Sequence, residues 1–248
     1  MSKEILNEKN CLITGATGTL GQCLAKRFAQ DSCNLFLTSR SLDKLHNLKI
    51  ELESINPTIK IFCEAYDLKN DNDINKLVKK AQQEFEAIDI LINNAGIFEV
   101  KSILDTTVED FNSMFNINIR APFLLSKALC KDMIKKRWGR IINIGSTAAY
   151  NGFKHHSLYS ASKHAILGFS RSLHEELKND GVRVFCVSTG PLISKMGKIV
   201  AEKSNFNFNS FIEPEEVAEY ISFAVSFNKE MISEEIRLHM LKEHVEQH

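Results

Sequence analysis

Residues 11–21 read Cys-Leu-Ile-Thr-Gly-Ala-Thr-Gly-Thr-Leu-Gly, which predicts a strand that turns directly into a helix. The first residues are apolar, and the glycines fall where the chain must turn before the amphipathic stretch 21–30. A helix that begins there presents free N–H groups and its positive dipole end, which can hold a pyrophosphate. A lone glycine triplet is more often an ordinary turn, but this position directly after an N-terminal strand favours dinucleotide binding.

Short apolar runs alternate with amphipathic stretches along the rest of the chain. We expect six strands from the apolar runs at 11–13, 34–37, 59–62, 88–92, 140–144 and 182–187, and a seventh within 234–240. We expect helices over 21–30, 42–55, 72–85, 108–136, 159–179 and from Pro214 to about Phe227. This alternation predicts an α/β fold with a Rossmann-like, doubly wound, mostly parallel seven-stranded sheet that carries helices on both faces.

We expect one domain over residues 1–248. The length suits one large α/β domain, and no internal repeat, low-complexity tract or Pro/Gly/Ser-rich linker divides the chain. The charged end, from about residue 241 to 248, is expected to fray.

Charge balance, cysteine spacing and the N-terminal residues indicate which binding partners and which cellular compartment to expect. Lys plus Arg and Asp plus Glu each number 31, so no net charge recruits nucleic acid or an anionic membrane. The six scattered cysteines form no Cys-x-x-Cys, and the N-terminus has no signal-peptide apolar stretch, which favours the cytoplasm. The neighbouring His155 and His156 lack a third ligand at metal spacing, so we expect no metal.

A possible acid–base pair lies in the segment Tyr-Ser-Ala-Ser-Lys at 159–163. Tyr159 and Lys163 are four residues apart, so on a helix they project from the same face. The ammonium would then lower the tyrosine pKa from its usual value of about 10, which suits a group that exchanges protons with a substrate. In isolation such a pair is more often a solvated helix face.

Arg40 bears on the choice of cofactor. It follows the second expected strand in the segment Thr-Ser-Arg-Ser, where no acidic residue is present to bind the adenosine ribose hydroxyls. A guanidinium there can bind a 2′-phosphate, which favours NADP over NAD. The alternative is a surface arginine that begins a helix.

Several further motifs resemble those of the short-chain dehydrogenase/reductase family, in its single-domain type. They are Asn-Asn-Ala-Gly at 93–96, Asp-Leu at 67–68, Ile-Asn-Ile at 117–119, and Ser146 thirteen positions before Tyr159. The resemblance extends over about residues 8–230. It implies an enzyme that transfers a hydride between a nicotinamide and a carbonyl or secondary alcohol.

The resemblance also implies a role for each matching residue. Tyr159 would be the general acid in reduction or the general base in oxidation, and Ser146 would hydrogen-bond the substrate oxygen. Lys163 would hold the nicotinamide ribose and lower the Tyr159 pKa, while Asn118 would position a proton-relay water. Residues expected to bind the cofactor are Gly15, Thr17, Gly18, Thr19, Leu20, Gly21, Arg40, Asp67, Leu68, Asn94, Ala95, Gly96, Tyr159, Lys163, Gly190, Leu192 and Ser194.

By the same resemblance, residues 194–213 would form a lid over the substrate, and the protein would be a homodimer or homotetramer. The leading hypothesis is an NADP-dependent oxidoreductase acting on a small or carrier-bound carbonyl, such as a 3-oxoacyl thioester, a keto sugar or a small ketone. A non-catalytic NADP-binding regulatory protein is an alternative. An NAD(P)-assisted epimerase or lyase is another, suggested by the glycine spacing that leaves Thr19 in place of a glycine, but too few residues follow Tyr159 for a separate substrate domain.

Overall fold

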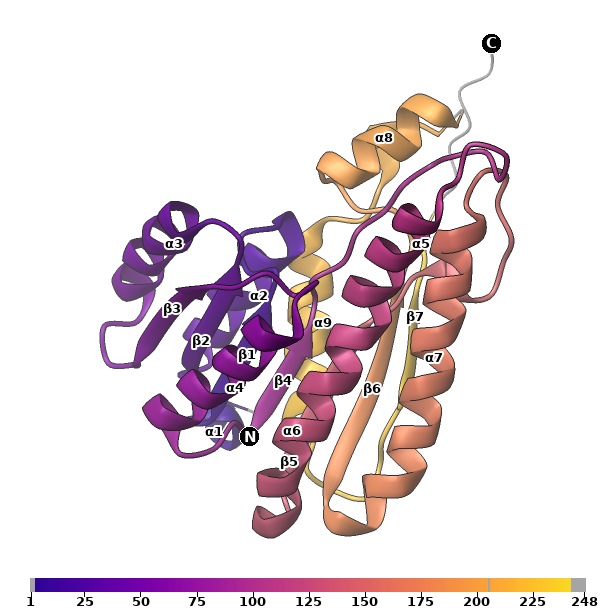
Figure 1. Cartoon of the computed structure of the whole chain (residues 1–248). Coiled ribbons are helices and arrows are strands. Elements are labelled where there is room, and N and C mark those ends of the chain that lie inside the picture. The colour runs from indigo at the N-terminus through magenta and orange to yellow at the C-terminus, as the bar shows by residue number, and fades with distance from the viewer. Residues whose placement is uncertain (1–2, 205, 242–248) are drawn as a thin grey trace.

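The central feature is one parallel sheet of seven strands, seen in a computed structural model that describes residues 3–204 and 206–241 (Figure 1). The strand order is β3-β2-β1-β4-β5-β6-β7, with every neighbouring pair parallel. The strands are β1 (Asn10–Thr14), β2 (Asn34–Ser39), β3 (Ile61–Ala65), β4 (Ile90–Asn93), β5 (Gly139–Ile144), β6 (Val182–Thr189) and β7 (Glu235–Leu238). The doubly wound fold and all seven expected strands are confirmed.

One face of the sheet is covered by helices from both ends of the chain. These are α1 (Lys3–Leu6), α2 (Thr19–Gln30), α3 (Leu42–Ile55) and α9 (Pro214–Ser226). The apolar sides of α2 and α9 pack together with buried residues such as Leu24, Phe28 and Ile221. Pro214 opens α9 in its first turn, followed by Glu215 and Glu216 at the positive end of the helix dipole.

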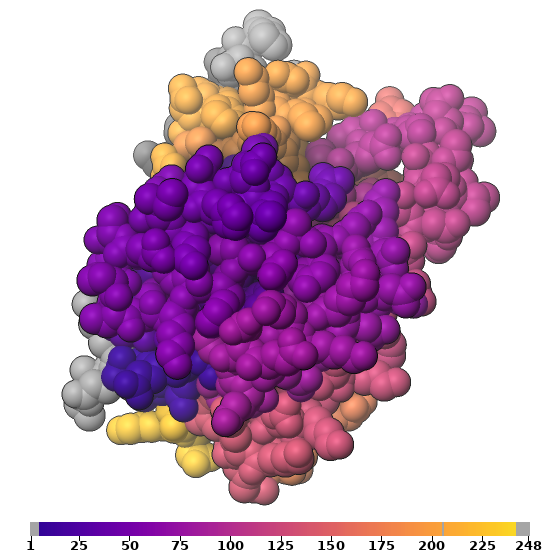
Figure 2. All heavy atoms as spheres, turned by 60° about the vertical axis from the view of Figure 1, so that its left-hand side comes forward, coloured from indigo at the N-terminus to yellow at the C-terminus, as the bar shows by residue number. Residues whose placement is uncertain are grey.

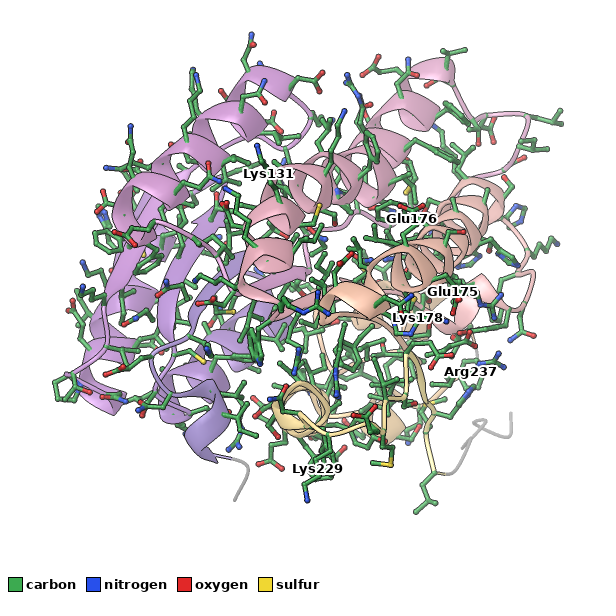
Figure 3. The ribbon with its side chains drawn as sticks, turned by 90° about the horizontal axis from the view of Figure 1, so that it is seen from below. Lys131, Glu175, Glu176, Lys178, Lys229 and Arg237 are labelled. Carbon is green, nitrogen blue, oxygen red and sulfur yellow. The ribbon has the colours of Figure 1, made fainter. Side chains whose placement is uncertain are left out.

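The other face carries α4 (Asp71–Phe85), α6 (Ala121–Lys136) and α7 (Ser157–Leu177). The Asn70 side chain accepts a hydrogen bond from the Asn72 amide and caps α4. The view from below shows Lys131 on α6 and Glu176 on α7 at the end of the molecule where these two helices finish (Figure 3). Both faces of the sheet are therefore buried, which explains its nearly continuous apolar strands.

The expected helix over 108–136 forms, but it is not α-helical throughout. The structure divides it into α5 (Val108–Phe115), a five-residue π-helical turn (Asn116–Arg120) and α6. Thr107 and Asp110 form a capping box at the start of α5. Because π turns are rare and appear frequently at functional sites, the position of Asn118 inside this one is notable.

The carboxyl ends of the strands face α8 (Lys195–Lys203), a helix that the sequence patterns did not predict. Short 3₁₀ turns lie at Thr147–Ala149, Lys178–Asp180 and Phe208–Ser210. Space-filling shows the orange α8 and the magenta segment after β4 standing at this end with a recess between them (Figure 2). Of the expected frayed end, 241–248, all but Leu241 lies outside the described residues.

No helix in the described ranges is long and apolar enough to cross a membrane. Within residues 3–204 and 206–241, no group of three His, Cys, Asp or Glu side chains is arranged to hold a metal ion.

Candidate active site and cofactor site

The glycine turn between β1 and α2 is shaped by close backbone approach. Gly15 has a φ of +63°, and a Cβ there would lie 2.8 Å from the Ala95 Cα. A Cβ on Gly21 would lie 2.3 Å from the Gly15 carbonyl oxygen. Both positions therefore require glycine, and α2 starts directly behind the turn with Gly18 as its N-cap and no side chain capping it.

Thr14 joins this turn to the Asn-Asn-Ala-Gly segment after β4. Its hydroxyl oxygen accepts hydrogen bonds from the amides of Asn94 (3.1 Å) and Ala95 (3.0 Å). The Asn94 side-chain amide donates to the carbonyls of Thr14 (3.0 Å) and Gly15 (3.1 Å). β1 and β4 are the neighbours at which the strand order reverses, the usual ligand crevice of such a sheet. Thr14 was not among the expected site residues, although it lies inside the glycine motif.

The expected adenosine-side residues follow β2 and β3. The Ala16 amide donates to the Thr38 carbonyl (3.1 Å), which joins the end of β2 to the glycine turn. Arg40, two residues further on, is exposed and has no ion-pair partner in the part of the chain that the structure describes. Asp67 is also exposed and accepts from the Lys69 amide, whereas Leu68 is buried.

The remaining expected cofactor residues follow β6, at the same edge of the sheet as those that follow β1 to β4. The Gly190 amide donates to the Leu238 carbonyl (2.8 Å). Leu192 pairs with Ile212 as an isolated bridge, and the Ser194 hydroxyl accepts from the Gly197 amide (3.0 Å) and caps α8. Thr17, Thr19 and Leu20 belong to the glycine turn and the first turn of α2, so every expected cofactor residue follows the carboxyl end of a strand or lies on α7.

The Asn118 side chain is almost fully engaged inside the protein. Its Oδ1 accepts from the Ile97 amide (2.9 Å), and its Nδ2 donates to the Ile97 carbonyl (3.1 Å) and to the Ser162 hydroxyl (3.0 Å). Ser162 in turn donates to the Tyr159 carbonyl (2.8 Å). Asn118 thus joins the segment after β4 to the first turn of α7, where Tyr159 lies. Neither sequence pattern nor resemblance singled out Ser162.

Lys163 is a buried cation with one acceptor among the described residues. Its Nζ donates to the Ile144 carbonyl at the end of β5 (2.8 Å) and lies 5.6 Å from the centroid of the Tyr159 ring. A Cβ on Gly96 would lie 3.9 Å from this Nζ and 3.4 Å from the Asn118 Oδ1, so Gly96 passes close to both groups. Burial lowers the pKa of Lys163 to about 8.

The Tyr159 pKa differs from the expectation. Burial raises it above its ordinary value, and a side-chain hydrogen bond with Ser146 lowers it by less. Lys163 contributes no cause of the shift, because its Nζ is directed to the Ile144 carbonyl. The expected lowering of the Tyr159 pKa by the ammonium is therefore absent from the protein alone. Ser146, which begins the 3₁₀ turn after β5, does lie at the phenol as the motif spacing predicts.

An aromatic wall stands beside Tyr159. Phe98 meets the Tyr159 ring edge-on at a centroid distance of 4.8 Å and lies 5.3 Å from the His156 ring. His156 also lies 5.8 Å from Phe153. Phe98 was missed because it belongs to an irregular segment without periodicity.

These residues fit a bound dinucleotide. The turn before α2 leaves no room for a Cβ at Gly15 or Gly21, as a turn that brings backbone amides toward a pyrophosphate requires. Thr38 adds a buried hydroxyl with no partner among residues 3–204 and 206–241, at the strand end between the glycine turn and Arg40.

Comparison with known proteins agrees with this geometry. Residues 9–205 match the family model described as short chain dehydrogenase. The 3-oxoacyl-(acyl-carrier-protein) reductase FabG of Buchnera aphidicola is 34% identical over 227 residues, covering 89% of this chain and 91% of that protein. The FabG of Aquifex aeolicus is 30% identical with the same coverage. A solved metagenomic short-chain oxidoreductase in complex with NADP shares the fold, with a TM-score of 0.82 at 23% identity, covering 96% of this chain and 100% of that one.

Proposed function

The chain belongs to the short-chain dehydrogenase family of NAD(P)-dependent oxidoreductases, and we propose that it uses NADPH to reduce a carbonyl, with Tyr159 as the acid. The proposal rests on one observation above all. Asn118, Ser146, Tyr159 and Lys163 converge at the carboxyl ends of β4 and β5, beside the glycine turn of the crevice.

Each of these residues has a distinct task in the proposed reaction. The Ser146 and Tyr159 hydroxyls both donate to the substrate carbonyl oxygen, which develops negative charge as its carbon is reduced. Tyr159 then transfers its proton to that oxygen, which becomes the alcohol. The bound nicotinamide supplies the hydride. Asn118 positions the first turn of α7 and thus the phenol.

Lys163 is suited to hold the nicotinamide ribose. An ammonium has three donors, and the Ile144 carbonyl takes one of them. Its two remaining donors can meet ribose hydroxyls and the phenolate that forms when the proton leaves. The expected proton-relay water is part of this proposal, although the Asn118 side chain is already committed to Ile97 and Ser162.

NADP rather than NAD is proposed on account of Arg40, which is exposed and unpaired at the end of β2 within the described chain. The bound ligand named for the metagenomic structure supports the same choice. The names of the bacterial relatives support a 3-oxoacyl thioester as the first substrate to test. We also place the enzyme in the cytoplasm, as for a reductase of carrier-bound substrates.

The test is the initial rate of NADPH oxidation with 3-oxoacyl thioesters, keto sugars, quinones and small ketones, with Tyr159→Phe as the baseline. Turnover of one class, reduced at least about 10³-fold in Tyr159→Phe, is the expected result. NADPH fluorescence would show equal cofactor binding in both proteins.

Two outcomes contradict the proposal. Equal turnover by the wild type and Tyr159→Phe would remove Tyr159 as the acid. NADPH binding without turnover of any class would favour the regulatory binding protein.

We also propose one domain over residues 1–248, with residues 194–213 as its lid, and assembly into a homodimer or homotetramer through the helices α5, α6 and α7. Phe111 is 44% exposed and Phe123 is 43% exposed, and both belong to this helical surface. Light scattering should give at least the mass of a dimer, and Phe123→Glu should lower that mass. A monomeric wild type would contradict the assembly.

A further inference from the structure

A basic groove lies beside the catalytic residues and has no part in the function proposed so far. It has a volume of about 340 Å³ and is lined by Val100, Ser102, Lys154, His155, His156 and Lys203. Two of these six residues are lysines, two are histidines, and none is acidic. Because Lys plus Arg equals Asp plus Glu in the whole chain, two lysines with no acidic residue in the lining are a local excess of positive charge.

Three separate segments are tied together around the groove. The Lys101 amide donates to the His155 carbonyl (2.9 Å), which joins the segment after β4 to the segment before α7. The Lys203 Nζ, at the end of α8, donates to the Val100 carbonyl (3.4 Å). His155 has a φ of +63°, in the left-handed region that few residues with a Cβ adopt. The groove is thus built by specific contacts of the proposed lid and two loops.

Nearby acidic groups do not cancel the charge of the groove. Asp110 is bound to Lys101 and to the Thr107 amide at the start of α5, so the charges of this pair neutralise each other. Glu99 does not line the groove but an adjoining small hollow, with Lys101 and Asp110, and His155 lines both spaces. Lys154 and Lys203 are both exposed, and within the described residues neither forms an ion pair.

The His156 ring is fixed at the boundary between the groove and the catalytic residues. Its Nδ1 lies 2.6 Å from the Lys154 carbonyl, and because a carbonyl only accepts, this nitrogen carries the proton. The ring centroids of His156 and Phe98 are 5.3 Å apart, and those of Phe98 and Tyr159 are 4.8 Å apart. One aromatic side chain therefore separates the wall of the groove from the phenol.

We infer that this groove is a subsite for a phosphate group of the substrate, held by Lys154 and Lys203 while the substrate carbonyl lies at Tyr159. The inference rests on the proposed function and narrows its substrate class to phosphate-bearing carbonyl compounds. Two lysines approaching from different segments suit the negative charge of a phosphate group, and the Ser102 hydroxyl adds a further donor.

Such a phosphate has two sources, a small keto phosphate or the 4′-phosphopantetheine arm of a carrier-bound thioester. Two matched substrate pairs distinguish them, since the members of each pair share a carbonyl and differ by one phosphate. One pair is dihydroxyacetone and dihydroxyacetone phosphate. The other is acetoacetyl-pantetheine and its 4′-phosphate.

The experiment measures KM for both pairs in the wild type and in Lys154→Gln, Lys203→Gln and Lys198→Gln. Lys198 is the matched control, because it is an exposed lysine of the same α8 that does not line the groove. In one pair we expect the phosphate to lower KM about tenfold. Lys154→Gln and Lys203→Gln should each remove most of that advantage, with kcat and the phosphate-free KM unchanged, while Lys198→Gln leaves it intact.

A second readout does not depend on turnover. Phosphorus NMR titration of NADPH-saturated protein with the two phosphate compounds reports their binding directly, while the cofactor occupies its own pyrophosphate site. If no carbonyl is reduced but phosphate binding still requires Lys154 and Lys203, the proposed function fails and the subsite stands. Equal KM values for both members of each pair, or equal losses of phosphate binding in all three lysine variants, would overturn the subsite.

Discussion

Two buried cations lie at opposite ends of β5 and are held in contrasting ways. Arg140, near the amino end, is fully buried and donates to the carbonyls of Val225, Gly139 and Phe227 and to the Asn228 side chain, at 2.8–3.2 Å. Lys163, at the carboxyl end, has the Ile144 carbonyl as its one acceptor within the described part of the chain. Burial lowers the pKa of both side chains.

The contrast distinguishes a structural cation from one kept for a ligand. Arg140 satisfies carbonyls at the end of α9, where a helix leaves acceptors free and its dipole favours a cation. The amino ends of the strands have other saturated charges, such as Asp89, which accepts from Lys136 and from the Asn10 amide. Lys163 bears the desolvation cost with few compensating bonds, as expected of a group that binds substrate or cofactor.

The largest effect should come from Lys163→Met, which removes the buried cation near the carboxyl end of β5. We expect turnover to fall about 10³-fold. The fold should gain roughly 1–3 kcal/mol at pH 7, because the folded-state pKa of about 8 lies below the usual lysine pKa of about 10.4. Below pH 8 the wild type buries a charge, so the gain should shrink as the pH rises from 8 toward 10.4. Urea unfolding at several pH values measures it, and a loss of stability at pH 7 would contradict it.

Arg140→Met removes the buried cation near the amino end of β5. In contrast to Lys163→Met, it should lower the unfolding free energy and leave turnover unchanged. It leaves the Val225 and Phe227 carbonyls without their donor, which should cost roughly 2–4 kcal/mol of unfolding free energy. Relief of repulsion from Arg183 offsets part of this cost. The kcat per folded molecule should stay at the wild-type value. A loss below about 1 kcal/mol in urea unfolding would show that Arg140 is not the structural counterpart of Lys163.

Glu235 on β7 extends the comparison to a charged group with several partners. Burial alone would raise its pKa, but the hydrogen bonds from Arg237, Arg171 and Tyr150 outweigh burial and bring the pKa down to about 2. We expect Glu235→Gln to cost roughly 2 kcal/mol at pH 7.

The sign of its pH dependence follows from the lowered pKa. The contribution of Glu235 to the unfolding free energy is complete above the usual glutamate pKa of about 4.3, and it is lost as the pH falls toward 2. The difference between wild type and variant in urea unfolding should therefore shrink between pH 4 and pH 2. A difference that grows over this range would refute the pairing.

The smallest effect is expected at Arg40, an exposed cation that does not bear the cost of burial. Arg40→Gln should raise the KM for NADPH about tenfold and leave the KM for NADH and the unfolding free energy nearly unchanged. Initial rates with both cofactors measure it. Equal increases in the two KM values would show that Arg40 does not read the 2′-phosphate.

Strand periodicity and motif spacing predicted the sheet and the convergence of Ser146 with Tyr159. Both signals are local in sequence, and parallel topology brings strand ends together. The direction of the Tyr159 pKa was wrong, because the helical spacing from Lys163 does not reveal that Ile144 offers its carbonyl to the ammonium. Phe98 and the groove depend on contacts between irregular loops, for which sequence patterns contain no signal.

The π turn at Asn116–Arg120 determines how α6 is rotated about its own axis, and therefore which of its side chains face the core. A five-residue turn contains one residue more than a regular α-turn, and each residue of an α-helix advances the chain by about 100°. Deleting a single residue here would rotate α6 by that angle and swing Leu125, Leu129 and Met133 out of the core. Asn118 therefore lies in the turn that sets the rotation of α6 relative to α5. The number of residues in this turn is as strictly constrained as their identity.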